Sequence, residues 1–195
     1  MKEYGSKNIR NVALVSHSSA GKTILTEAFL HFTGVTTRMG SINEGNTVSD
    51  FDEEEIRRGF SLYTSVIPIE YRDVKINLLD TPGYTDFIGE MISALSVADS
   101  TLVVVDAVSG YEVGTEVAWS YCDKFNLPRI LLINKMDREN ADFQKSLHSV
   151  QEKVSTRLIP VQLPWGEKLD FKGVIDLLTM KAYKGSGKDS EEIPA

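Results

Sequence analysis

The stretch "NVALVSHSSAGKT", residues 11–23, decides the fold of this 195-residue chain. Its first six residues form an apolar run that is typical of a buried strand. The loop that follows, residues 16–23, matches the phosphate-binding pattern GxxxxGK followed by Ser or Thr, except that Ser16 replaces the first glycine. We therefore expect a strand, an anion-binding loop and a helix over residues 22–32 in immediate succession.

The chemistry of this loop suits a phosphate group. Inward-pointing N–H groups make an anion nest, and the start of the helix adds the positive end of its dipole. Lys22 is expected to place its charge on the β- and γ-phosphates, and the Thr23 hydroxyl to bind Mg²⁺. The residues expected to contact the nucleotide here are His17 (through its backbone N–H), Ser18, Ser19, Ala20, Gly21, Lys22 and Thr23.

Apolar runs alternate with helix-period segments along the rest of the chain, as in a mostly parallel, covered sheet. Further strands are predicted at residues 61–71, 74–80, 100–107 and 128–135, and further helices at residues 87–97, 114–125 and 141–158. The first two of these strands should form a hairpin that turns at Arg72 and Asp73. The pattern predicts an α/β protein with the P-loop NTPase fold, a sheet of five or six strands and helices on both of its faces.

Two segments depart from this alternation. Residues 33–59 show almost no apolar period, and a gap this long is either functional or disordered. After residue 158 the chain offers only short strands and turns, and its last residues, "GSGKDSEEIPA", are predicted as a loop. We therefore expect a nucleotide-binding core over residues 1–158 and a different subdomain over residues 159–195.

A second motif, "DTPG", follows the predicted strand at residues 74–80. Asp80 at the carboxyl end of a strand beside a phosphate loop is placed to hold Mg²⁺, usually through water. Gly83 can bring its backbone N–H against a γ-phosphate, because no side chain stands in the way. The motif is weak by itself and becomes specific only in this position.

A third motif, "NKMD", ends the predicted strand at residues 128–135. The carboxylate of Asp137 can accept hydrogen bonds from N1–H and the 2-amino group of guanine, which adenine cannot supply. The amide of Asn134 can meet the base edge or brace the phosphate loop, and the stem of Lys135 can cover the ring face. Together, the three motifs predict a guanine-nucleotide-binding domain.

Composition limits the other possibilities. A net charge of −7 argues against sequence-specific nucleic-acid binding by this domain, although a local patch or another domain could still contact a ribosome. The single cysteine, Cys122, excludes an internal disulfide and fits a reducing compartment. No apolar run approaches the roughly 20 residues of a membrane helix, and the polar start is no signal peptide. We expect a monomeric, cytoplasmic protein.

These motifs resemble the GTPase domain of the translational GTPases, most closely the elongation factor G group. The likeness also covers "GSINEGNTVSDFDEEEIRRGFSLYTSVIPIEY", "DTPGYTDFIGEMISALSVADSTLVVVDAVSGYEVGTE" and "IPVQLPWGEKLDFKGVIDLLTMKAYKG". It implies GTP and GDP as substrate and product, Mg²⁺ as cofactor and the ribosome as partner of the full-length protein. It also implies that residues 159–195 begin an inserted α+β subdomain, and that the chain is an N-terminal fragment of a larger factor.

The chain departs from the resembled pattern at three positions. Tyr84 stands where the family usually has a His that orients the attacking water, and a phenol cannot become an imidazolium. Ser19 stands where the family usually has an Asp linked to a monovalent cation. The resemblance therefore does not decide whether this chain binds that second cation. Ser61 replaces the Thr of the first switch and keeps the hydroxyl, so the resemblance makes it a Mg²⁺ ligand together with Thr23 and Asp80.

Two functions follow from these observations. The first is a slow GTPase of the elongation factor G type, in which Tyr84, Lys22 and Gly83 carry the catalytic step. The second is a GTP-gated binding module with negligible hydrolysis, because Tyr84 replaces the usual catalytic His. Phosphoryl transfer depends mainly on positioning and Mg²⁺ electrostatics, which favours the first.

Overall fold

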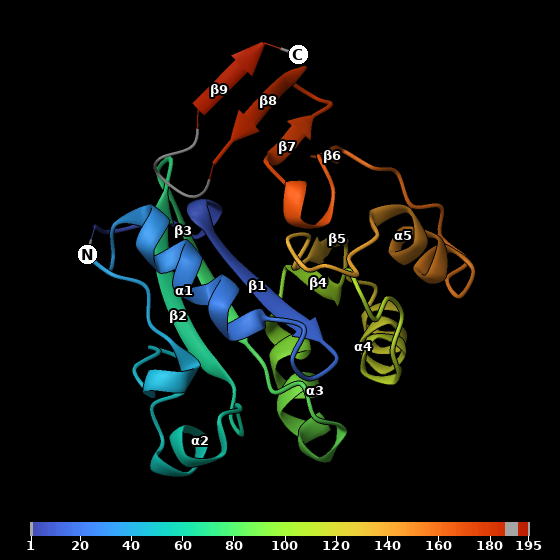
Figure 1. The fold of residues 1–195 in the computed structure, drawn as a ribbon. Coiled ribbons are helices and arrows are strands. Elements are labelled where there is room, and N and C mark those ends of the chain that lie inside the picture. The colour runs from blue at the N-terminus through green and yellow to red at the C-terminus, as the bar shows by residue number, and fades with distance from the viewer. Residues whose placement is uncertain (1, 186–190, 195) are drawn as a thin grey trace. The chain divides into compact units, whose positions relative to one another are not determined.

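The computed structural model of the chain describes residues 2–185 and 191–194 (Figure 1). The chain divides into two compact units. The first unit contains Met1–Val104 and Glu112–Leu132, and the second contains Val105–Tyr111 and Ile133–Ala195. No helix within the described ranges is long and apolar enough to cross a membrane.

The main sheet has five strands in the order β2-β3-β1-β4-β5. Their bounds are Ile9–Ser16 for β1, Ser65–Tyr71 for β2, Val74–Asp80 for β3, Ser100–Asp106 for β4 and Arg129–Asn134 for β5. Strand β1 runs parallel to β3 and to β4, and β2 runs antiparallel to β3. The predicted α/β class with a mostly parallel sheet is confirmed.

The predicted hairpin joins β2 to β3. Tyr71 lies opposite Val74, and the two residues between them, Arg72 and Asp73, have φ values of 47° and 61°. Two consecutive left-handed residues are the signature of the type I′ turn, whose twist matches that of the strands. Strand β2 is one of the two edge strands of this sheet and carries Pro68, which lies opposite Asn77.

Helices cover both faces of the sheet in the first unit. Helix α1 (Lys22–Thr33) packs on one face, where a core cluster forms from Leu14, Leu30, Ile67, Ile69 and Leu78. Ala13 and Val15 alternate with Leu14 along β1, so they point to the opposite face, and both are fully buried. Helices α3 (Ile88–Val97) and α4 (Val113–Lys124) contact β1 as well.

Two buried carboxylates order the segment between α1 and β2. It contains a 3₁₀ turn (Ile42–Glu44) and the short helix α2 (Glu53–Arg58). Glu27 of α1 accepts hydrogen bonds from the N–H groups of Gly40 (2.7 Å) and Val48 (2.6 Å). Glu55 accepts from the N–H groups of Leu62 and Tyr63. The aperiodic stretch is therefore held by side chain to backbone bonds rather than by an apolar face.

Helix α5 (Phe143–Gln151) is shorter than the predicted helix at residues 141–158. It begins two residues after the predicted start, where the Asp142 side chain caps the helix by accepting from the Lys145 N–H. Its predicted end is wrong. The Gln151 side chain bonds to the backbone of Thr156 and Leu158 and so closes a turn after the last helical residue.

A second, antiparallel sheet lies in the second unit, in the order β6-β7-β8-β9. Its strands are Gln162–Trp165, Gly173–Asp176, Lys181–Lys184 and Glu191–Pro194. The loop predicted for the last residues is wrong at β9, which pairs with β8; residues 186–190 and 195 lie outside the described residues. The domain boundary expected at residue 158 stays a prediction.

Candidate functional site

The predicted phosphate loop joins β1 to α1. Ser19 (φ 61°) and Gly21 (φ 106°) both adopt left-handed backbone conformations, which fold the chain back on itself before the helix. Gly21 is the residue that precedes the first helical residue, so the loop ends at the amino terminus of a 12-residue helix. The strand, loop and helix succession predicted from the sequence is present.

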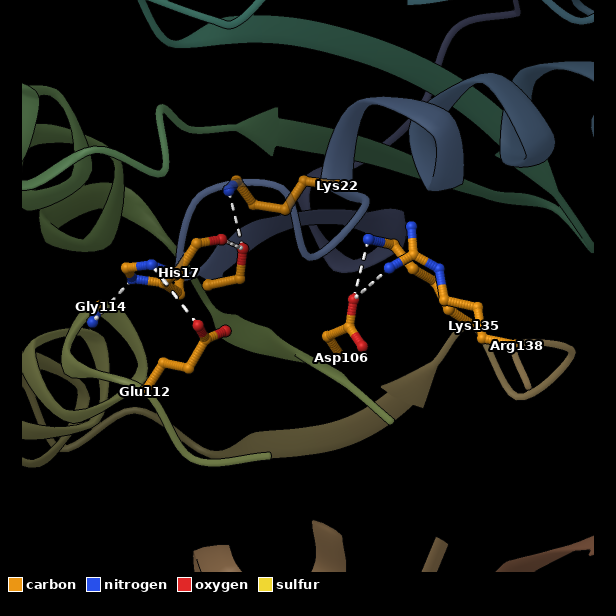
Figure 2. A network of polar contacts seen from close by, with 8 residues as sticks. His17, Lys22, Asp106, Glu112, Gly114, Lys135 and Arg138 are labelled. Atoms are coloured by element: carbon orange, nitrogen blue, oxygen red, sulfur yellow. Dashed lines mark hydrogen bonds and ion pairs between the residues drawn. The ribbon is translucent and has the colours of Figure 1, made fainter. Parts of the chain in front are cut away.

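Lys22 is the first residue of α1, directly after this loop, and is 6% exposed. Its Nζ donates to Ser16 Oγ at 2.7 Å, and Ser16 Oγ donates to the His17 carbonyl oxygen at 2.6 Å (Figure 2). Burial lowers the pKa of Lys22 to about 8, against the opposing effect of the carboxylates of Asp80 and Asp50. The lysine is thus a buried cation placed among the groups of an anion-binding loop.

Asp80 ends β3 and is 1% exposed. Neither carboxylate oxygen has a hydrogen-bond partner, although the hydroxyls of Ser49 and Thr26 approach them. Burial raises the pKa of Asp80 to about 6, and the nearby Lys22 ammonium opposes this rise. A buried carboxylate without donors is costly unless a cation or another charged partner offsets its desolvation.

Hydroxyl groups complete an oxygen-rich cluster around this position. Ser61 Oγ lies 3.4 Å from Thr23 Oγ1 and donates to Asp50 Oδ1 at 2.6 Å. Oxygen donors of this kind fit Mg²⁺, with the remaining positions left to water and phosphate. The described residues contain no group of three or more His, Cys, Asp or Glu side chains suited to a metal, so hydroxyls are needed to complete the set.

Gly83 brings the DTPG segment against the phosphate loop. A Cβ atom at this position would stand 2.7 Å from Lys22 Nζ and 2.7 Å from Ser18 Cα. Thr81 fixes the same segment, because its hydroxyl donates to the Leu14 carbonyl at 2.7 Å. Two motifs that are about 60 residues apart in the sequence therefore meet within the first unit, and only glycine permits the contact.

Tyr84 follows at once and is 40% exposed. Its ring packs on the ring of Phe60, with centroids 4.5 Å apart and planes tilted by 52°. Phe60 directly precedes Ser61, and the Arg58 guanidinium lies 6.0 Å from its centroid. The segment carrying Ser61 is thereby joined to the segment carrying Tyr84 by an aromatic contact.

The NKMD motif lies in the second unit at the end of β5. Lys135 has a φ of 62°, and its Nζ forms an ion pair with Asp106 Oδ2 at 2.9 Å (Figure 2). Arg138 Nη1 lies 3.4 Å from the same oxygen, and the Asn134 carbonyl accepts from the Ala107 N–H. Burial raises the pKa of Asp106, but Lys135, the Val108 N–H and Arg138 together hold it below its usual value.

The side chains around Lys135 leave Asp137 at the surface. Met136 is buried in a cluster with Ala107 and Ala141, whereas Asp137 is exposed. This alternation anchors the turn through Met136 and presents the Asp137 carboxylate to solvent, as a group that accepts hydrogen bonds from a ligand requires.

Several residues of these clusters were not predicted from the sequence. Asp50 and Phe60 both lie in the quoted stretch "GSINEGNTVSDFDEEEIRRGFSLYTSVIPIEY", in which only Ser61 was given a role. Asp106 follows a run of three valines at the end of a strand, which is the same position that Asp80 occupies. A carboxylate at the end of an apolar strand is therefore the sequence pattern by which Asp106 could have been identified.

The phosphate loop after β1, DTPG after β3 and NKMD after β5 define a P-loop protein of the G domain class. The chain belongs to the elongation factor Tu GTP binding domain family, which matches residues 7–194. It is a G domain of the elongation factor G-like translation GTPases.

Similar proteins support this placement. The chain is 37% identical over 195 residues to elongation factor G of Granulibacter bethesdensis, covering 97% of this chain and 28% of that protein. It is 40% identical over 191 residues to elongation factor G of Thermotoga petrophila, covering 95% and 28%. It is 38% identical over 192 residues to mitochondrial ribosome-releasing factor 2 of Anopheles gambiae, covering 96% and 26%.

A solved structure shares the fold. The crystal structure of ttk003000868 from Thermus thermophilus matches with a TM-score of 0.90 at 38% identity. The match covers 96% of this chain and 28% of that one. The chain thus spans little more than a quarter of the relatives that it matches.

Proposed function

We propose that this chain binds GTP with Mg²⁺, cleaves it slowly and serves as the nucleotide-controlled domain of an elongation factor G-like factor. The observation that carries the proposal is that Gly83 lies against the buried Lys22, whose ammonium is close to the buried, unpartnered Asp80. A buried cation beside a loop of N–H donors suits phosphate, and a buried bare carboxylate suits a metal ion.

In this proposal, Lys22 and the N–H groups of residues 17–23 hold the phosphates, and the Gly83 N–H contacts the γ-phosphate. Thr23, Ser61 and Asp80 would hold Mg²⁺, which supplies charge neutralisation at the β- and γ-phosphate oxygens. Asp137 and Asn134 select guanine, and the Lys135 stem lies on the base.

Hydrolysis requires a water molecule to attack the γ-phosphorus while the bond to the β-phosphate oxygen of GDP breaks. Tyr84 can accept a hydrogen bond from that water and orient it, but its neutral phenol cannot supply positive charge. Loss of a positioned polar group costs about 10²–10³ in rate, so cleavage should be slow rather than absent.

A second function is favoured by one contact. The Tyr84 ring is packed on Phe60, which could hold it away from the attacking water. The chain would then act as a GTP-gated binding module with negligible hydrolysis, and the exchange of GTP for GDP would be its only control.

The ribosome is the proposed partner, acting on the full-length protein. The names of the relatives, elongation factor G and ribosome-releasing factor 2, support this partner. A monomer in the cytoplasm fits that role. The overall charge of −7 requires that contacts with RNA be local or made by other parts of the protein.

Single-turnover cleavage of GTP, with and without ribosomes, tests the proposal. We expect cleavage by the wild-type chain, faster cleavage by Tyr84→His because an imidazole can carry positive charge, and no binding by Lys22→Ala. If the wild type binds GTP and never cleaves it, the binding-module alternative is correct. If it does not bind GTP at all, both functions are wrong.

A further inference from the structure

A chain of polar contacts leads from Lys22 to the first turn of α4 (Figure 2). The Lys22 ammonium donates to Ser16 Oγ, and Ser16 Oγ donates to the carbonyl of His17. The imidazole of the same His17 accepts a hydrogen bond at Nδ1 from the Gly114 N–H, at 3.2 Å. The group expected to hold phosphate is therefore connected, through two residues, to the start of a helix that lies far away in the sequence.

Both nitrogens of the His17 ring are engaged. Since Nδ1 accepts from a backbone N–H, the neutral ring carries its hydrogen on Nε2. Nε2 lies 3.6 Å from Oε1 of Glu112, the residue that precedes α4. The ring is thus oriented from two sides by the first turn of one helix.

The position of Gly114 shows, independently of the hydrogen bond, that the first turn of α4 lies close to the phosphate loop. A Cβ atom at Gly114 would stand 2.6 Å from the Cα of His17 and 2.7 Å from its Nδ1. A clash with a Cα atom cannot be relieved by rotating a side chain. Only glycine lets the first turn of α4 approach the phosphate loop this closely.

We propose that His17 is a positioning residue that fixes the phosphate loop against the first turn of α4, so that displacement of this turn weakens the hold of Lys22 on bound nucleotide. The inference rests on the proposed function, since it assumes that Lys22 binds phosphate. His17 does not touch the reacting atoms through its ring; it acts through Ser16 and Lys22.

This arrangement gives α4 control over nucleotide release. Val113, next to Gly114, is 65% exposed, so the turn can be reached from solvent. A binding partner that moved this turn would change the loop without contacting the nucleotide. The expected signature is a change in the rate at which nucleotide leaves.

The test is the dissociation rate of a fluorescent GDP from the chain, chased with excess GDP. His17→Ala should release it about three- to tenfold faster, the effect of losing one hydrogen bond. His17→Asn should restore a rate near that of the wild type, because its Oδ1 stands where Nδ1 stood and can accept the Gly114 N–H. Val113→Ala, in the same turn, should leave the rate unchanged.

A double-mutant cycle separates positioning from a general loss of stability. If His17 acts through Ser16, then His17→Ala should add nothing to the rate of Ser16→Ala. Additive effects, or equal rates for His17→Ala and the wild type, would overturn the inference. If the wild-type chain takes up no fluorescent GDP, the proposed function fails and the inference fails with it, which is a distinct result.

Discussion

At the scale of single residues, Gly83 shows why a motif position is restricted. Its missing side chain is what allows the DTPG segment to lie against Lys22 and Ser18. We predict that Gly83→Ala weakens GTP binding by about 1–3 kcal/mol, the usual cost of forcing an atom into a filled space. Titration of the wild type and of Gly83→Ala with a fluorescent GTP measures this difference in binding free energy.

Gly89→Ala is the matched control for that substitution. Gly89 lies in α3, and a Cβ atom there would meet nothing within 4 Å. The control should bind GTP like the wild type and raise the free energy of unfolding by about 1 kcal/mol, because alanine favours a helix. Equal GTP affinity for Gly83→Ala and the wild type would contradict the steric argument.

The elements that carry the motif residues could be predicted because each motif is local, and the roles of those residues toward a nucleotide stay predictions. Lys22 begins α1, Asp80 ends β3 and Asp137 lies in the turn after β5, and these elements are recognisable in the sequence. Phe60 and Gly114 could not be predicted in the same way. Their contacts join segments that are far apart in the sequence. A local sequence pattern does not predict which distant residue an aromatic ring or a glycine will contact.

At the scale of elements, the contact between Phe60 and Tyr84 links two segments that flank the predicted phosphate site. Aromatic pairs contribute about 0.5–1.5 kcal/mol beyond the area that they bury. We predict that Phe60→Ala slows the cleavage of bound GTP by about three- to tenfold, because Tyr84 loses the group that positions it. Single-turnover cleavage at saturating GTP isolates this step.

Phe60→Tyr keeps the ring and should retain the wild-type rate. If Phe60→Ala instead speeds cleavage, Phe60 restrains Tyr84 rather than positioning it. That result would favour the second proposed function, the GTP-gated binding module, in which the packing of Tyr84 on Phe60 suppresses hydrolysis.

Glu27 organises another element, the segment between α1 and β2. The carboxylate is buried and accepts two backbone N–H groups, from Gly40 and Val48. We predict that Glu27→Gln, which can accept fully at only one of these, loosens the segment at a cost of about 2 kcal/mol. Hydrogen exchange should accelerate at the amides of Gly40 and Val48.

Glu44→Gln provides the comparison for this change. Glu44 is exposed, and its carboxylate accepts only from the Asn46 side chain among the described residues. Exchange at Gly40 and Val48 should be unaffected in that variant. Unchanged exchange in Glu27→Gln would mean that other contacts hold the segment.

The elements themselves were predicted where apolar period and length agreed. The predicted end of α5 was wrong because the Gln151 side chain bonds to the backbone after the helix and closes a turn. The residues that follow still have a helical period, so the sequence pattern does not show where the helix stops. Strand β9 was missed because it is only four residues long, begins with two glutamates and depends on pairing with β8 rather than on its own composition.

At the scale of the whole chain, Asp106 gives folding a dependence on pH. Its pKa lies below the usual value of about 4, so the unfolded chain binds this proton more tightly than the folded chain. The stability that Asp106 contributes is therefore fully present when the pH is above the usual pKa of about 4. It is lost as the pH falls through the lowered pKa of the folded chain. Asp106→Asn should reduce the free energy of unfolding by about 1–3 kcal/mol at pH 7.

Urea denaturation at a series of pH values measures this difference. The gap between Asp106→Asn and the wild type should narrow as the pH falls below about 4. Asp170→Asn, an exposed position in the same unit, should show no such narrowing. If the difference in the free energy of unfolding between Asp106→Asn and the wild type stays constant with pH, the loss of stability comes from changed packing or hydrogen bonding and not from the charge of Asp106.

The edge strand β2 has a consequence for how copies of this chain meet. An exposed edge is a template on which a second chain can add a strand, and repeated addition builds fibrils. Pro68 lacks an N–H group, and sheets place such a residue on an edge with its nitrogen facing outward. A strand arriving at the β2 edge would find no donor at its middle, so this edge resists growth into a continuous cross-β stack.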